Sequence, residues 1–319
     1  MTEIFRFRPL LQPTIWGGNK ISVMKGVSSD EAIGESWEIS GIEGKETVVA
    51  EGQYQGLGVN ELADALKERL LGRANYERFG SRFPLLIKFI DACRDLSIQV
   101  HPDDETAHRH GLASGKTEMW YVMPSSPGAR LYNGLRRQTD AGQLRQMVAD
   151  KTITEALSQY EVSEGDVFFI PAGRIHAIGT GCMVAEIQQT SDTTYRLYDY
   201  DRRDANGNPR QLHVEQAAEC IDYRVQEDYR TRYQPTCNQP TTVVSCPYFT
   251  TSVMPVSGKA AVDCSAIDSF IIVMAVSGEG SIDADGTTVA VQTGQTILLP
   301  ATAQRIEACG DMTVLLIWI

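Results

Sequence analysis

The chain has no excess of positive charge. Its 29 Lys and Arg residues are outnumbered by 41 Asp and Glu residues, which gives a formal net charge of −12. Nucleic acids and anionic membranes select for faces rich in Lys and Arg, so neither is expected as the main partner. If the substrate is itself an anion, a few cations must be gathered in one cleft against this background.

Long apolar runs are also missing. The longest, such as residues 83–90 and 314–319, are far too short to cross a bilayer, and the N-terminal MTEIFRFRPL contains no signal-peptide core. The seven cysteines are scattered, odd in number and without CxxC spacing. These absences favour a reduced, cytoplasmic protein.

Most of the sequence consists of short β-like runs separated by Gly, Pro, Asn or Asp. Two stretches differ. Residues 60–79 place leucines at helical spacing after Asn60, a candidate N-cap, and residues 139–160 indicate two helices with a break near 150–152. We therefore expect a mainly β protein with helical insertions near 60–80 and 139–160.

An internal repeat suggests two related modules. Residues 165–171 (GDVFFIP) and 294–300 (GQTILLP) share a glycine and a proline at the same spacing, each around a short strand. The first copy continues to His176, whereas the matching position of the second is Arg305. The expected architecture is two jelly-roll β-sandwiches, with a catalytic domain over 1–235 and a degenerate C-terminal copy over 236–319.

The first copy, Gly165-x5-Pro171-x-Gly173-x2-His176, resembles the second motif of the cupin superfamily. A cupin site needs further ligands from an earlier strand. In residues 97–101 (SIQVH), Gln99 and His101 are two apart, so both project to one face of an extended strand while the apolar residues between and before them face the other way. The resemblance therefore implies a cupin-type fold with a metal site.

A closer resemblance covers more of the chain. Residues 98–105 (IQVHPDDE), 115–122 (GKTEMWYV) and 185–202 (AEIQQTSDTTYRLYDYDR) closely resemble type I mannose-6-phosphate isomerases in their shorter bacterial form. The resemblance implies one Zn²⁺ per chain and interconversion of mannose 6-phosphate and fructose 6-phosphate through an enediol. It also implies four metal ligands: Gln99, His101, Glu118 and His176.

Three further residues are expected to act on the substrate. The essential arginine of the family falls at Arg196, whose planar guanidinium suits a phosphate or enediolate oxygen. Lys116, two residues before Glu118, would reach the same cavity as a phosphate anchor or proton shuttle. Glu186 lies where the family uses a residue of its active site and is a candidate general base. Lys88, Arg174 and Arg202 are reserve cations, whereas no ligand role is expected of His108, His110 and His213.

Two other functions stay open, and an isomerase with a different sugar preference is a third possibility. A cupin oxygenase using Fe²⁺ would normally carry more histidine ligands, and Gln99 speaks against it. A non-catalytic sugar-binding cupin would have little reason to keep a metal site together with Lys116 and Arg196. The expected partner is a small sugar phosphate, and the expected assembly is a monomer or a homodimer.

Overall fold

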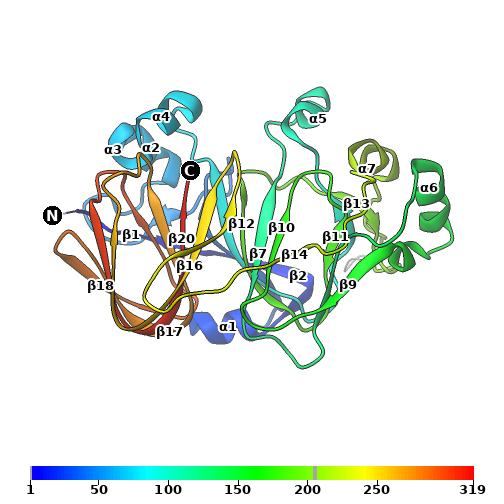
Figure 1. Cartoon of the computed structure of the whole chain (residues 1–319). Helices are drawn as coiled ribbons and strands as arrows, with labels where there is room; N and C mark the ends of the chain where they lie inside the picture. The colour runs from blue at the N-terminus through cyan, green and yellow to red at the C-terminus, as the bar shows by residue number, and fades with distance from the viewer. Residues whose placement is uncertain (1, 204–206) are drawn as a thin grey trace. The chain divides into compact units, whose positions relative to one another are not determined.

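The computed structural model describes residues 2–203 and 207–319, and the chain divides into two compact units. Unit 1 combines Met1–Leu10, Trp37–Lys88 and Arg232–Ile319, and unit 2 combines Leu11–Ser36 and Phe89–Thr231. Both are built mainly of antiparallel strands, as expected (Figure 1). The domain boundary between residues 235 and 236 stays a prediction.

Unit 1 contains one eight-stranded sheet with the order β15-β16-β20-β17-β19-β1-β4, and β18 pairs with β17. Its apolar core is formed by residues that alternate along the long strands, among them Val314 and Leu316 of β20. The strands of this unit are β1 (Phe5–Arg8), β4 (Val48–Val49), β15 (Thr241–Ser245), β16 (Thr250–Asp263), β17 (Ile271–Ala284), β18 (Thr287–Gln292), β19 (Thr296–Leu299) and β20 (Arg305–Trp318).

The helical region predicted near 60–80 is confirmed, but it consists of three short helices that lie together in Figure 1: α2 (Val59–Leu66), α3 (Glu68–Leu71) and α4 (Arg73–Phe79). Positive φ angles at Lys67 and Gly72 separate them. The predicted N-cap is wrong, because Gly58 occupies that position. The Asn60 side chain instead donates to Gly41 O at 2.9 Å and accepts from Phe83 N at 2.8 Å.

Unit 2 contains a five-stranded sheet with the order β13-β6-β11-β8-β9 and the consecutive strands β14-β10-β7-β12 of a second sheet. The remaining strands of that second sheet, β2 (Leu10–Gly18), β3 (Ile33–Ser40) and β5 (Leu85–Asp91), contain residues of both units. The other strands are β6 (Ile98–Val100), β7 (Glu118–Val122), β8 (Arg130–Leu135), β9 (Leu157–Glu161), β10 (Val167–Ile170), β11 (His176–Ile178), β12 (Met183–Gln189), β13 (Tyr195–Tyr198) and β14 (Arg230–Thr231).

An apolar core fills the space between these two sheets, with Trp120 and Val122 of β7 facing Ile178 of β11. A second core on the other face of the five-stranded sheet contains Ile98 and Val100. It is covered by α6 (Ala141–Ala149) and α7 (Val214–Cys220), which lie side by side in Figure 1. The remaining helices of the unit are α1 (Lys20–Lys25), α5 (Asp104–Arg109) and the 3-10 turn η1 (Ile153–Ala156).

The second predicted helix of residues 139–160 is only partly correct. After α6 the chain breaks at Asp150–Thr152 as expected, but the next helical segment is the single 3-10 turn η1, and residues 157–160 belong to strand β9. Leu157 is buried in the core as part of a strand rather than of a helix. Packing against β8 has overridden the apparent helical spacing.

The repeated glycines occupy equivalent turns. Gly165 and Gly294 have φ angles of 89° and 85°, and they precede β10 and β19 respectively. Such angles are readily adopted by glycine, which explains its presence in both copies. Among the described residues, no helix has the length and apolar composition needed to cross a bilayer.

Candidate metal centre

Three strands of unit 2 bring the predicted ligands together. Gln99 of β6 is the register partner of His176 in β11 on one side and of Arg196 in β13 on the other. Glu118 begins β7 on the facing sheet, and it shares its strand face with Trp120, which points into the core between the sheets. The ligands therefore continue the inward-facing positions of the sandwich, as the alternation of extended strands predicts.

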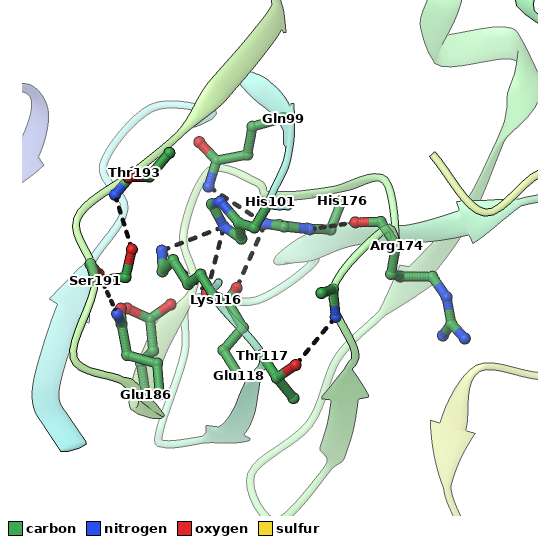
Figure 2. A network of polar contacts seen from close by, with 12 residues as sticks. Gln99, His101, Lys116, Thr117, Glu118, Arg174, His176, Glu186, Ser191 and Thr193 are labelled. Atoms are coloured by element: carbon green, nitrogen blue, oxygen red, sulfur yellow. Dashed lines mark hydrogen bonds and ion pairs between the residues drawn. The ribbon is translucent and has the colours of Figure 1, made fainter. Parts of the chain in front are cut away.

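The two histidines and Glu118 converge on one point (Figure 2). The Nε2 atoms of His101 and His176 lie 3.4 Å from Glu118 Oε2 and Oε1 respectively. The potential ligand atoms of the three side chains lie within 4.8 Å of one another, and none of the side chains is more than 1% exposed. Two imidazoles and one carboxylate in a buried cluster are a donor set that divalent zinc or a similar ion accepts.

The His176 ring is oriented by the main chain. Its Nδ1 donates a hydrogen bond to Arg174 O at 2.8 Å, so the lone pair of Nε2 faces the cluster. Gln99 Nε2 lies 3.3 Å from that nitrogen and donates to it, while Gln99 Oε1 accepts from Ser97 Oγ at 3.3 Å. A half-turn of the amide would present Oε1 to the cluster instead. Gln99 is thus placed to serve as a fourth ligand.

The protonation states suit a metal ion. Burial, reinforced by the Lys116 charge, lowers the pKa of His101 to about 3, and burial also lowers the pKa of His176. Burial opposes ionisation of Glu118, but the adjacent Lys116 ammonium outweighs it and holds the Glu118 pKa well below its usual range. Neutral imidazoles and an ionised carboxylate are the forms that bind metals.

Lys116 lies inside the cluster rather than at its edge. Its Nζ is 3.0 Å from Glu118 Oε2 and 3.2 Å from His101 Nε2, and the side chain is almost fully buried. The position is set by the main chain, since Lys116 N donates to Pro102 O at 3.0 Å. The ammonium balances the Glu118 charge and is close enough to exchange protons with groups bound in the cluster.

Arg196 is half-buried beside the ligand strand. Its Nε donates to Ser97 Oγ at 3.2 Å and its Nη1 to Gln211 O at 3.0 Å. Nearby Asp199 does not pair with Arg196, because it binds Arg202 and Arg210, each at 2.5 Å. The Arg196 charge is therefore held in place by neutral acceptors and stays available to an anionic ligand.

Glu186 lies on the same face of the sandwich as Glu118. In the pairing of β12 with β7, Gln188 is opposite Glu118 and Glu186 is opposite Trp120. Trp120 Nε1 donates to Glu186 Oε1 at 2.9 Å, and its ring forms a T-shaped pair with the His176 ring, with 5.4 Å between centroids. Trp120 thus orients both a candidate metal ligand and a candidate base. The sequence alone did not predict this role, although the alternation of the strand places Trp120 on the same face as Glu118.

The three remaining histidines lie outside the cluster. His108 contacts Ala113 O, and His110 contacts the Tyr195 hydroxyl at 2.6 Å and Glu219 at 3.2 Å. His213 Nδ1 accepts from Arg196 N at 3.3 Å. That none of the three is a metal ligand stays a prediction. In the second copy of the repeat, exposed Arg305 binds Glu307 and no ligand replaces His176.

Comparison with known proteins identifies the relatives of this chain. Residues 4–126 match the family described as phosphomannose isomerase type I, catalytic domain, and residues 239–319 match the mannose-6-phosphate isomerase cupin domain. The chain is 34% identical over 302 residues to mannose-6-phosphate isomerase ManA of Bacillus subtilis, with 94% of this chain and 93% of the relative covered.

A second relative is mannose-6-phosphate isomerase of Streptococcus mutans, 35% identical over 317 residues that cover 99% of this chain and 98% of the relative. The crystal structure of the mannose 6-phosphate isomerase from Bacillus subtilis superposes with a TM-score of 0.87 and 30% identity, and all of both chains is covered. These matches confirm the expected cupin-type β fold. The chain belongs to the type I mannose-6-phosphate isomerase family.

Proposed function

We propose that this chain interconverts mannose 6-phosphate and fructose 6-phosphate at the cluster of unit 2, with one Zn²⁺ per chain. His101, Glu118 and His176 would hold the ion, and Gln99 would complete the set through Oε1. The observation that carries the proposal is the convergence of two buried, neutral imidazoles and an ionised carboxylate on one point. Membership of the family supports the reaction and the sugar phosphate as substrate.

The reaction moves one proton between C2 and C1 of the open-chain sugar. A bound Zn²⁺ would supply a Lewis acid that polarises a sugar oxygen and makes the neighbouring carbon more acidic. The protein must then provide a base for that proton, an acid for ring opening and a cation for the phosphate.

Lys116, Glu186 and Arg196 fit these three tasks. Lys116 carries protons 3.0 Å from Glu118 and suits the acid–base work of ring opening. Glu186, oriented by the Trp120 indole, is the candidate base for the carbon-bound proton. Arg196 offers a permanently charged fork, held by Ser97 and Gln211, for the phosphate or for an enediolate oxygen.

The family assignment favours neither the oxygenase nor the non-catalytic sugar-binding alternative. A coupled assay for fructose 6-phosphate, run before and after chelation and with oxygen uptake recorded in parallel, separates the three. We expect mannose 6-phosphate to be converted, activity to be lost on chelation and no oxygen to be consumed. Metal-dependent oxygen uptake without isomerisation would overturn the proposal.

A further inference from the structure

Arg174 is a buried cation without a carboxylate partner. It lies in the loop between β10 and β11, and only 8% of it is exposed. Its guanidinium packs over the Tyr229 ring at 4.5 Å from the centroid, but among the described residues it forms neither a hydrogen bond nor an ion pair. A permanent charge buried in this way is costly unless something compensates it.

The guanidinium faces a cavity. Figure 2 shows the Arg174 side chain pointing away from the metal ligands, although its main chain touches His176. On that side lies a cavity of about 590 Å³, which Arg174 and Tyr229 help to line. Arg224 and Gln226 on its wall are exposed, so the cavity reaches the surface. Its volume is in the range of sites that bind small molecules.

The acidic residues of the cavity wall already have partners. Asp222 receives two hydrogen bonds from the Arg224 guanidinium, at 2.8 and 2.7 Å, and Asp228 accepts from Arg230 N at 3.0 Å. The Arg230 side chain donates to Glu161 O at 2.8 Å. The lining carries three arginines against two aspartates, a formal charge of +1, and among the described residues the Arg174 guanidinium is the one that makes no hydrogen bond or ion pair. The cavity therefore attracts an anion.

We propose that this cavity is a second binding site, for a small phosphate-bearing anion, with Arg174 as its central charge. The planar guanidinium, held over the Tyr229 ring, can present two parallel N–H groups to phosphate oxygens. Arg224 is on the same wall and can add a second cation by sharing its bond with Asp222. The volume leaves room for a phosphate ester with a small organic group.

The same loop joins this cavity to the metal centre. Gly173 N donates to His101 O at 2.9 Å, and Asp222 N, on the cavity wall, donates to Gly173 O at 2.8 Å. The next carbonyl, Arg174 O, orients His176. An anion bound to Arg174 would restrain this loop and, through it, both histidine ligands. Binding of the anion does not depend on whether the cluster is an isomerase centre.

The test is phosphate binding to the metal-loaded protein by titration calorimetry and ³¹P NMR, with inorganic phosphate and glycerol 3-phosphate as probes. We expect an R174Q variant to lose one binding event, or to weaken it by at least about tenfold, because charge-assisted hydrogen bonds are removed. An R145Q variant is the matched control, since Arg145 is exposed, is paired with Glu215 and does not line this cavity. It is expected to bind as the wild type does.

Two further variants keep the result decisive. R196Q is expected to retain the event that R174Q loses, which separates this cavity from the substrate site. R224Q changes an exposed residue and is expected to fold. The substitution removes the ion pair of Asp222 with Arg224, so Asp222 can compete with phosphate for Arg174, and phosphate binding should weaken. Tighter binding of the ester than of phosphate, or equal binding, would each support the site and identify what it recognises. Wild-type phosphate binding by both R174Q and R224Q, or a single event lost only in R196Q, would overturn it.

Discussion

Lys116 Nζ lies 3.0 Å from Glu118 Oε2 in a cluster that is closed to solvent. A divalent ion on Glu118 would compete with the ammonium for that oxygen and repel it. The lysine thus balances the carboxylate in the metal-free protein and must release it when an ion binds. The residue that carries protons at this site is also the competitor of the metal.

Replacing Lys116 by Met should therefore separate metal binding from turnover. We expect K116M to bind zinc at least as tightly as the wild type, because the competing charge is gone, while kcat for isomerisation falls by about 10²-fold or more through loss of acid–base catalysis. Zinc titration and the coupled assay measure the two effects. K151M, at an exposed lysine paired with Asp201, is the control. A loss of zinc affinity in K116M would contradict this role.

Acid should destabilise the metal-free protein. Burial lowers the pKa of His101 to about 3 and also lowers that of His176, whereas an unfolded histidine titrates near 6.5. Below 6.5 the unfolded chain binds protons that the folded chain refuses, so the free energy of unfolding falls by up to about 1.4 kcal/mol per pH unit for each histidine. The stability that ionised Glu118 contributes is lost at lower pH, as the pH falls below 4.5, the ordinary pKa of a glutamate side chain.

Urea unfolding of the metal-free protein between about pH 7.5 and about pH 5 measures this slope. H101Q removes one of the histidines whose pKa burial lowers and should make the slope shallower, while H108Q, at an exposed histidine outside the cluster, should leave it unchanged. An unfolding free energy that does not change over this range would show that the buried histidines are not held neutral.

Arg196 should act mainly on the charged part of the substrate. We expect R196Q to lower kcat/KM by about 10²- to 10³-fold, since one or two charge-assisted hydrogen bonds are removed, and R196K to recover part of the loss. R136Q, at an exposed arginine on the same unit, is the control. Because Arg196 also bonds Ser97 and Gln211, the melting temperature must be measured alongside. Unchanged kcat/KM in R196Q would remove Arg196 from the mechanism.

The Trp120–Glu186 hydrogen bond should matter for both stability and turnover. Removing the indole donor in W120F leaves a buried carboxylate oxygen without this bond, which should cost about 1–3 kcal/mol of unfolding free energy. If Glu186 is the base, E186Q should lower kcat by about 10²- to 10⁴-fold. If the indole acts through Glu186, the double variant should lose less kcat than the product of the losses in W120F and E186Q.

W16F is the matched control, because Trp16 lies in the same apolar core but its indole nitrogen makes no hydrogen bond to a described residue. It should lose stability without a comparable loss of kcat. Strictly additive effects of W120F and E186Q on kcat would mean that the indole does not act through Glu186.

The sequence was most informative where the local pattern also determines the position in space. The alternation in residues 97–101 predicted that Ile98 and Val100 would face away from Gln99, and both are buried in the core beneath α6 and α7. The turn glycines Gly165 and Gly294 were found for the same reason, since a positive φ favours glycine at each copy.

The sequence was least informative where tertiary contacts decide. Residues 157–160 have helical spacing but pair with β8, and Gly58 rather than Asn60 begins α2, because the Asn60 side chain is engaged by Gly41 and Phe83. The contact between the Arg174 carbonyl and His176 could not be predicted either, because any residue at that position has a backbone carbonyl.

The metal content of the purified protein tests the central claim most directly. Elemental analysis should find one zinc per chain in the wild type, and chelation should remove the zinc and the isomerase activity together, with both restored on adding zinc. E118Q and H176N should contain far less zinc, whereas H108N should match the wild type. Full activity in metal-free protein, or wild-type zinc content in both E118Q and H176N, would contradict the account.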